Sequence, residues 1–487
     1  MDYAASFALI APELVLTISG LVLLLVAAWG GDKASRMISI AAAVSLGGAF
    51  ALAAPAVCTG ATGLDTMAFG DLFRADAYAN LAKLMIFAAA GAVLVVAPRF
   101  FTGIGEMRAE YPILVVFAAL GMSIMVSATN LLTLYIGLEL NSLAAYVLAA
   151  FLRDDERSAE AGLKYFVLGA LASGILLFGM SLVYGFAGTT NFMGIAEAVQ
   201  GDLSTGMLFG LIFMLAGLAF KISAAPFHMW TPDVYEGAPT PTTMFFASAP
   251  KVAAVALLAR VMMEGFGTQV DAWRQVVIAA ALLSIIIGAL GAIGQTNIKR
   301  LLAFSSINNV GFILIGLAAA TVTGISAMLV YLAIYVVMTV GSFVAVLLMR
   351  DAEGNQVEGI SDLAGLSTTR PALAAVMAML MFSLAGIPPL FGFWGKFVVF
   401  EAVVQADMLA LAAIGIAASV IGAFYYIKVV KIMYFDEPAG TITGEGDTPH
   451  WALLFICAAI VSPLGYLLTP WLGELADGAA ASLMLPA

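Results

Sequence analysis

The sequence predicts an all-α polytopic membrane protein with about 14 transmembrane helices. Of its 487 residues, 63% are hydrophobic and only 10% are charged, whereas a soluble protein carries about 25% charged residues. A soluble fold with so few charged side chains could not cover its surface. The sequence also lacks a series of alternating segments of about ten residues, which is the pattern of a membrane β-barrel.

Long apolar runs follow one another along the whole chain. Each has about 20 residues or more, which is enough to cross about 30 Å of hydrocarbon as a helix. The runs begin near Ala8, Ser35, Ala75, Tyr111, Asn130, Ser158, Thr205, Pro241, Asp271, Asn297, Gly324, Pro371, Asp407 and His450. The longest polar connections, residues 350–370 and 435–449, are short, so we expect no soluble domain between the helices.

Lysine and arginine are distributed unevenly between the loops that join these runs. Of the 20 lysines and arginines, most lie in odd-numbered loops, and the even-numbered loops hold only Arg74, Arg260 and Arg274. Short loops rich in basic residues remain on the cytoplasmic side of a membrane. The distribution therefore predicts that odd loops face the cytoplasm and that both termini lie outside.

Two proline-containing segments, residues 220–232 and 385–396, place proline, aromatic residues and a lysine in the middle of an apolar run. Proline removes a backbone donor and breaks a helix, and the freed carbonyls are tolerated only where they face protein or water. The segments belong to the seventh and twelfth predicted helices. Because an odd offset of five helices reverses direction across the membrane, we predict two inverted five-helix repeats, helices 4–8 and 9–13, with broken helices 7 and 12.

This pattern divides the chain into four predicted units. Residues 1–110 hold helices 1–3, residues 111–266 the first inverted repeat, residues 267–436 the second, and residues 437–487 helix 14 and a tail. The first and last units lie outside the repeats.

Ionisable side chains near the bilayer centre are the strongest indication of function, because each costs about 2.5–3.5 kcal/mol at a helix centre. Glu139 lies about nine residues, or about 14 Å, into its helix. Lys251 lies at a similar depth behind Pro250. Neither has a counter-charge one turn away. The structural alternative for Glu139 is a hydrogen bond to Ser142 or Asn141.

The two broken helices hold further candidates. Lys221 has no charged neighbour one turn away and precedes the break in helix 7. His228 follows that break, where it could relay a proton or act as an ordinary packing residue. Lys396 follows the prolines of helix 12, and Glu401, five residues later, could partly neutralise it.

Two other lysines have weaker sequence signals. Glu160 precedes Lys164 by four residues, an arrangement that favours a helix ion pair of only about 0.2–0.5 kcal/mol. The residues alone leave function and simple pairing equally open for Lys164. For Lys83, which shares a helix face with Asp76 and Asn80, pairing or snorkelling to the membrane surface is the favoured interpretation.

Metal-binding and nucleic-acid-binding patterns are missing from the sequence. The two cysteines, Cys58 and Cys457, and the two histidines, His228 and His450, do not have the spacing of a metal, redox or haem site. There is no basic patch and no flavin, iron–sulfur or quinone motif. We therefore expect no bound cofactor, no metal and no nucleic acid.

The stretch from Phe220 to Pro241 reads Lys-x4-Pro-Phe-His-x-Trp-x-Pro-Asp-x-Tyr-Glu-Gly-Ala-Pro-Thr-Pro from Lys221 onward. It resembles the seventh and eighth helices of the antiporter-like subunits of respiratory complex I, and the resemblance extends over nearly the whole chain. Three features are similar to the bacterial subunit N type. Lys396 stands where the subunit M type has a glutamate, Lys251 is the central lysine, and no long amphipathic helix follows the last apolar run.

The resemblance implies roles for matching residues in a proton relay. These residues are Glu139, Lys164, Lys221, His228, Lys251 and Lys396. Glu139 and Lys164 would form a charge-coupling pair, Lys251 would be the central relay, and Lys396 would face the outer exit. No role is implied for Lys83.

The resemblance also implies a setting for the chain. It would be a multi-pass subunit of proton-translocating NADH-quinone oxidoreductase in the bacterial inner membrane, with periplasmic termini. NAD, FMN, iron–sulfur clusters and quinone would be bound by other subunits. Its partners would be antiporter-like subunit M, the small K/J-type subunits and membrane lipids. The alternatives are a subunit of a multi-subunit cation/proton antiporter and a structural scaffold that does not pump.

Overall fold

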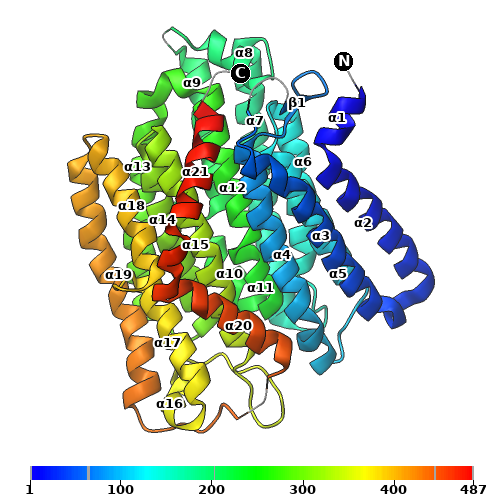
Figure 1. The fold of residues 1–487 in the computed structure, drawn as a ribbon, viewed down its shortest axis with the longest axis vertical. Helices are drawn as coiled ribbons and strands as arrows, with labels where there is room; N and C mark the ends of the chain where they lie inside the picture. Colours follow the sequence, from blue (N-terminus) through cyan, green and yellow to red (C-terminus); the bar gives the residue numbers. More distant parts are fainter. Residues whose placement is uncertain (1–2, 63–65, 202, 444–445, 485–487) are drawn as a thin grey trace.

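The predicted all-α architecture is confirmed. The computed structural model describes residues 3–62, 66–201, 203–443 and 446–484, so the outermost residues of the first and last predicted units lie outside the described part. Within it, helices stand side by side in a bundle, and the only sheet is one short hairpin (Figure 1). The beginning of the described chain and the end of its last helix lie at the same end of this bundle.

Residues 3–103 form three long helices, a short leading helix and the hairpin. The elements are α1 (Tyr3–Leu9), α2 (Ala11–Gly30), η1 (Gly31–Ala34), α3 (Ser35–Cys58), β1 (Met67–Ala68), β2 (Phe73–Arg74) and α4 (Ala77–Gly103). Helix α4 begins where the Asp76 carboxylate accepts a hydrogen bond from the Ala79 backbone N–H, at 2.8 Å, which satisfies a donor that the first helical turn leaves free.

Residues 110–265 contain the first broken helix. The elements are α5 (Glu110–Val126), α6 (Leu131–Ala149), α7 (Glu156–Ala187), α8 (Phe192–Ala198), α9 (Thr205–Ile222), α10 (Trp230–Gly237), α11 (Thr240–Ala247), α12 (Ala249–Arg260) and the π-helical turn η3 (Val261–Gly265). The predicted interruption of helix 7 lies between α9 and α10. Predicted helix 8 also divides, at Ser248, because Pro250 in the first turn of α12 cannot donate a backbone hydrogen bond.

Residues 267–435 contain the second broken helix, between α17 and α18. The elements are η4 (Gly267–Gln269), α13 (Val270–Ile293), α14 (Ile298–Ala318), α15 (Val322–Leu347), η5 (Ser361–Leu363), α16 (Leu366–Thr369), α17 (Pro371–Ala385), α18 (Phe391–Gln405) and α19 (Leu409–Phe435). Both predicted breaks are thus present. The inverted relation of the two repeats and the four-unit division stay predictions.

The last predicted helix differs from the expectation of one span. It consists of α20 (Thr448–Val461), η6 (Pro463–Leu468) and α21 (Thr469–Met484), and the chain bends by 68° between its two parts. Pro463 lies directly after Ser462 at the bend, and its ring prevents the helix from continuing. Among the described residues, 10 helices are long and apolar enough to cross a membrane, or up to 11 with this bent pair. The figure of about 14 spans stays a prediction.

Small residues allow close helix contacts beside the charged side chains. A Cβ atom on Gly137 of α6 would lie 2.7 Å from the Met125 backbone nitrogen of α5. Likewise, a Cβ atom on Gly392 of α18 would lie 2.0 Å from the Ser383 carbonyl oxygen of α17. Only glycine permits these approaches. They fix α6, which bears Glu139, and α18, which bears Lys396.

Candidate functional site

The amine of Lys251 binds the end of the first broken helix. Its Nζ donates to the carbonyl oxygen of Ile222, at 2.8 Å, and to the hydroxyl oxygen of Ser223. Ile222 is the last residue of α9, and Ser223 has the left-handed φ of 61°. The side chain of Lys251 is only 1% exposed. A buried amine therefore occupies the negative end of a half-helix, where a positive charge would lie on the favourable side of the dipole.

Lys396 makes the corresponding contact at the second break. Its Nζ donates to the carbonyl oxygens of Leu384 and Ala385, both at 3.1 Å, and to the hydroxyl of Ser419 at 3.3 Å. The amine also lies 4.5 Å from the ring centroid of Phe312. Both breaks thus end on a lysine amine. At the first break, the amine comes from α12, which belongs to predicted helix 8. At the second break, it comes from α18, the other half of the same broken helix.

Lys221, in the last turn of α9, faces α6. Its Nζ donates to the Ser142 hydroxyl at 2.8 Å and lies 5.8 Å from the ring centroid of Tyr146. Glu139 lies one turn before Ser142 on α6. Oε1 of Glu139 is buried and has no hydrogen-bond partner among the described residues. The alternative in which Ser142 binds Glu139 is not seen, because Ser142 accepts from Lys221 and donates to Leu138.

Among the described residues, Lys164 pairs with Glu160, as its spacing suggested, and with Asp233, but not with Glu139, the partner that the resemblance implies. Its Nζ lies 2.7 Å from Glu160 and 2.6 Å from Asp233 of α10. In the part of the chain that the structure describes, no ion pair joins Lys164 to Glu139. The sequence identified the Glu160 pair from its four-residue spacing, but Asp233 is 69 positions away and gave no such signal.

His228 lies in the connection between α9 and α10. Its Nδ1 atom is buried without a hydrogen-bond partner among the described residues. Next to it, Trp230 donates from Nε1 to the Phe220 carbonyl at 3.1 Å, and its ring stacks on Tyr165 with a centroid separation of 4.5 Å. His228 therefore lies beside the break, and none of the hydrogen bonds found among the described residues joins it to Lys221 or Lys251.

A string of hydroxyl groups that the sequence analysis did not identify lies between Lys251 and Lys396. The Tyr335 hydroxyl donates to the Ala247 carbonyl at 2.9 Å, one turn before Lys251, and lies 2.8 Å from the Ser306 hydroxyl. These groups border an enclosed cavity of about 10 Å³, close to the volume that one water molecule needs. The cavity is lined in part by Ser305, Ser306, Tyr335, Thr339, Ser342 and Leu384. The carbonyl of Leu384 is an acceptor for Lys396.

Comparisons with known proteins agree on one family. The family model described as NADH:quinone oxidoreductase/Mrp antiporter, transmembrane, matches residues 128–422. NADH-quinone oxidoreductase subunit N of Erythrobacter litoralis is 67% identical to this chain over the full length of both proteins. The chain belongs to the NADH-quinone oxidoreductase subunit N family. Subunit N of Sphingopyxis alaskensis is 57% identical over 99% of both chains.

Solved structures share the fold of this chain. A chain of respiratory complex I from Thermus thermophilus, with bound aureothin, is 30% identical and covers 96% of this chain and 99% of its own, with a TM-score of 0.80. A chain of the Mrp complex from Dietzia is 23% identical, with a TM-score of 0.83, a likeness that concerns the fold alone. The chain is thus a multi-pass membrane subunit of an NADH-quinone oxidoreductase.

The chain also contains a buried ion pair that the sequence suggested only in part. Lys83 is fully buried, which excludes snorkelling, and its Nζ lies 2.7 Å from the carboxylate of Glu13 in α2. The Ser123 hydroxyl donates to the same carboxylate. The sequence favoured pairing for Lys83 but suggested Asp76 or Asn80 on its own helix. It could not show that α2 lies against α4.

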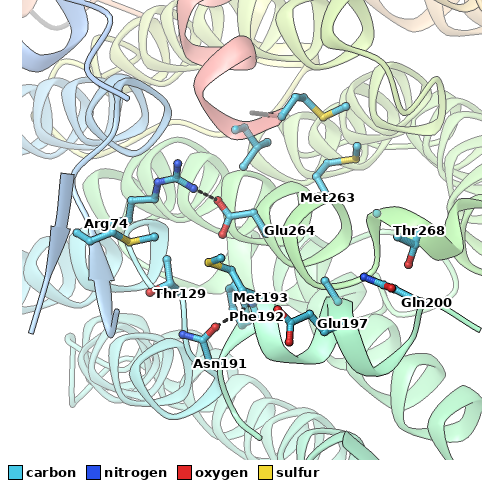
Figure 2. A pocket seen from close by; sticks show the side chains of 15 residues that line it. Arg74, Thr129, Asn191, Phe192, Met193, Glu197, Gln200, Met263, Glu264 and Thr268 are labelled. Atoms are coloured by element: carbon cyan, nitrogen blue, oxygen red, sulfur yellow. Dashed lines mark hydrogen bonds and ion pairs between the residues drawn. The ribbon is translucent and has the colours of Figure 1, made fainter. Parts of the chain in front are cut away.

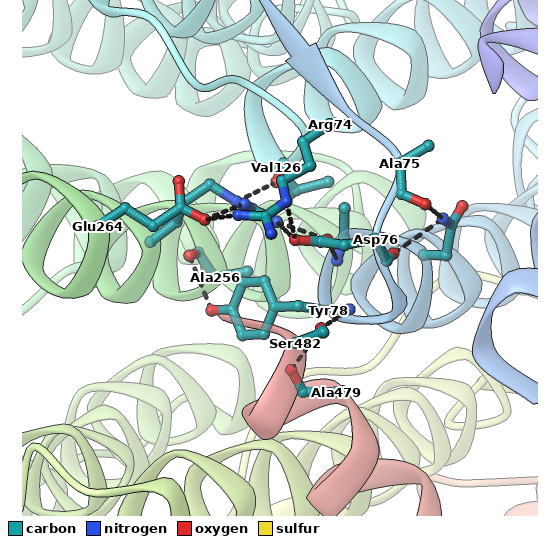
Figure 3. A network of polar contacts seen from close by, with 12 residues as sticks. Arg74, Ala75, Asp76, Tyr78, Val126, Ala256, Glu264, Ala479 and Ser482 are labelled. Carbon is teal, nitrogen blue, oxygen red and sulfur yellow. Dashed lines mark hydrogen bonds and ion pairs between the residues drawn. The ribbon is translucent and has the colours of Figure 1, made fainter. Parts of the chain in front are cut away.

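A second buried group of charges lies at the far end of α12 (Figure 3). Arg260 donates to both carboxylate oxygens of Asp76, at 2.7 and 2.9 Å, to Glu264 at 2.6 Å, and to the Val126 carbonyl at 3.0 Å. Arg74 lies 3.1 Å from Glu264. The sequence analysis placed both arginines in loops, but their exposed fractions are 3% and 0%. Both arginines lie inside the bundle instead, where their charges pair with carboxylates.

Arg74 and Glu264 also border a cavity of about 410 Å³ (Figure 2). Because their charges are already paired with each other and with Arg260 and Asp76, we assign these four residues a structural role. The described residues contain no group of three or more His, Cys, Asp or Glu side chains arranged to hold a metal ion.

Proposed function

We propose that this chain is a proton-translocating subunit of the membrane arm of NADH-quinone oxidoreductase. It moves protons from cytoplasm to periplasm through a chain of intramembrane lysines and a glutamate, coupled to quinone reduction in other subunits. The observation that supports this proposal most strongly is that each of the two broken helices ends on a buried lysine amine, Lys251 or Lys396. Buried ionisable groups beside broken helices are typical of ion paths in membranes.

The contacts of Lys251 suggest how charge at one site affects the next. A protonated amine binds the terminal carbonyl of α9, whereas a neutral amine loses most of the attraction to the half-helix dipole. The residue before this carbonyl is Lys221. Protonation of Lys251 therefore acts on the turn of helix that positions Lys221, in addition to the Coulomb repulsion between two nearby cations.

On the α6 side of Lys221, we propose that Glu139 and Lys221 act together. Glu139 lies one turn before Ser142, whose hydroxyl Lys221 binds. In general, burial in a low dielectric opposes a proton on an amine, and a nearby carboxylate favours it. When the two influences compete, a change in a neighbouring charge suffices to move the proton. Lys164 and His228 complete the proposed relay on this side, although neither hydrogen-bonds to Lys221 in this structure.

Transfer from Lys251 to Lys396 would use the hydroxyl string of Tyr335 and Ser306. Hydroxyl groups both donate and accept hydrogen bonds, so they can pass a proton together with one water molecule in the adjoining cavity. Lys396 would then release the proton towards the outside. Of the residues in this proposal, those of the string were found only through the structure.

The proposed setting follows from the family. NAD, FMN, iron–sulfur clusters and quinone would be bound by partner subunits and would supply the electron transfer. The antiporter-like subunit M, the small K/J-type subunits and membrane lipids would surround this chain in the bacterial inner membrane, with both termini periplasmic. The 67% identity to subunit N over the whole chain favours this setting over that of a separate cation/proton antiporter.

The test is a Lys251→Ala variant of the assembled complex in inverted membrane vesicles. We expect the pumped protons per NADH oxidised, or the turnover itself, to fall by about 10-fold or more, as for the loss of a group that transfers protons. Lys33→Ala, which removes an exposed lysine from η1, is the control. Normal assembly, turnover and pumping in Lys251→Ala would instead support the scaffold function.

A further inference from the structure

Lys164 belongs to a group of charged side chains on α7, α10 and the start of α14. The two oxygens of the Asp233 carboxylate serve two different cations: Oδ2 lies 2.6 Å from Lys164, and Oδ1 lies 2.7 Å from Arg300. Glu160 is the second partner of Lys164, and Glu236 is the second partner of Arg300, at 2.9 Å. Asp233 is therefore the link between two otherwise separate ion pairs.

This group is accessible to water. The side chains of Lys164, Glu160 and Asp233 are 40%, 64% and 33% exposed, and they border a cavity of about 230 Å³. Ion pairs of such exposure are weak and break easily. Because α7 begins after the predicted fifth loop, the cavity lies on the side predicted to be cytoplasmic.

Glu139 is in the opposite situation, because its buried Oε1 has no hydrogen-bond partner among the described residues. The relative height of the two groups follows from an aromatic contact. Tyr165, next to Lys164, packs against Tyr146 with ring centroids 5.0 Å apart. Tyr146 lies seven residues after Glu139, or about 10 Å along the axis of α6. Lys164 must therefore leave its present partners before its amine can approach Glu139.

We propose that Asp233 and Glu160 are positioning residues that hold Lys164 at the cytoplasmic side of α7 and compete with Glu139 for its ammonium group. This inference rests on the proposed function. In one state the amine faces water and can exchange its proton. In the other it neutralises Glu139, whose Oε1 atom is buried, and weakens the attraction of Glu139 for a proton on Lys221.

Arg300 makes this exchange possible at little electrostatic cost. When Lys164 leaves, Asp233 keeps its hydrogen bond to Arg300. Of the carboxylates in this group, only Glu160 then loses the cation with which it pairs, and Glu160 is exposed. Arg300 lies at the start of α14 and Asp233 on α10. The contact therefore also joins the second predicted repeat to the broken helix of the first.

The experiment compares four forms of the assembled complex in inverted vesicles: wild type, Asp233→Asn, Lys164→Ala and the double variant. Asparagine keeps the shape of the side chain and an acceptor for Arg300 but removes the charge that attracts Lys164. Glu236→Gln is the matched control, because Glu236 binds Arg300 and has similar exposure but does not contact Lys164. Assembly is checked on native gels, and the pumped protons per NADH oxidised are measured.

We expect both single variants to lower this ratio several-fold and the double variant to be no worse than Lys164→Ala, because Asp233 acts through Lys164. Asp233→Glu should restore much of the loss. If Lys164→Ala lowers the ratio but Asp233→Asn leaves it unchanged, the inference is overturned and the proposed function is not. Additive losses in the double variant would have the same meaning. An unchanged ratio in Lys164→Ala would overturn the role of Lys164 in the proposed relay, and this inference with it. If Asp233→Asn does not assemble, Glu160→Gln supplies the same comparison, and normal pumping by that variant would overturn the inference.

Discussion

A buried lysine needs acceptors for its three N–H groups, and at residue scale this requirement explains where the amines of this chain lie. Lys251 and Lys396 use carbonyls that the broken helices leave without an intrahelical partner. The free carbonyls at each break therefore stabilise a buried amine, and the amine supplies these carbonyls with a hydrogen-bond donor. A neutral amine can still donate to these carbonyls, so the site tolerates both protonation states.

The first prediction at this scale concerns the Tyr335 hydroxyl. Tyr335→Phe removes the hydroxyl that joins the Ala247 carbonyl to Ser306 and should interrupt transfer between Lys251 and Lys396. We expect a several-fold loss of pumped protons per NADH in assembled complexes. Tyr111→Phe, at a fully buried tyrosine of α5 outside the string, controls for the loss of a buried hydroxyl. Equal activity of the two variants would exclude the string as a path.

At the scale of elements, the buried charges on the side of the bundle where the termini lie join helices from three parts of the chain. Arg260 of α12 binds Asp76, which caps α4, and the carbonyl that ends α5. Tyr78 of α4 donates from its hydroxyl to the Ala256 carbonyl, at 2.9 Å, and from its backbone N–H to Ser482 of α21, at 3.0 Å. These contacts fasten α4, which precedes the predicted repeats, to α12 and α21.

A stability prediction follows from this network. Arg260→Met leaves the buried carboxylates of Asp76 and Glu264 with Arg74 as their only cation, and breaking a buried pair in this way costs about 3–5 kcal/mol. We expect a lower thermal inactivation temperature of the purified complex and readier proteolysis of α2 to α4. Arg108→Met removes an exposed arginine that pairs with Asp32 and Glu106 and should change little. If the two variants were equally stable, the network would not fasten these helices.

At the scale of the whole molecule, the distribution of charge predicts how the bundle lies in the membrane. Basic residues are concentrated in odd loops, and α16 and the loop before it lie at the end of the bundle opposite the termini (Figure 1). This arrangement is what a chain with both termini on one side requires. The same distribution of basic residues predicts that the group around Lys164 and Asp233 lies on the cytoplasmic side.

The orientation can be tested with the native cysteines. Cys58, at the end of α3, is exposed, whereas Cys457 is buried. With the termini outside, a membrane-impermeant maleimide should label Cys58 in spheroplasts and not in sealed inverted vesicles. An Arg153→Cys variant in the exposed loop before α7 should show the reverse pattern. Labelling of Cys58 from the cytoplasmic side would show that the termini are cytoplasmic. It would also reverse the direction of proton movement proposed for the relay.

The sequence by itself determined the helical membrane fold and the two breaks, and it singled out Glu139, Lys221, Lys251 and Lys396 as ionisable residues inside apolar runs. Each of these follows from local chemistry: apolar runs of sufficient length, prolines that cannot donate, and charges at countable distances from helix ends. The resemblance in the segment from Phe220 to Pro241 added the family and, for Lys164, a role that local chemistry left open.

Only the tertiary structure decided which groups these side chains meet. The Ile222 carbonyl that binds Lys251 lies 29 residues away, Asp233 lies 69 residues from Lys164, and Glu13 is on a different helix from Lys83. Serine, tyrosine and carbonyl partners have no distinctive spacing in a sequence, because a contact between helices depends on how their faces are rotated and packed. The hydroxyl string and the shared Asp233 carboxylate therefore appear only when the helices are assembled.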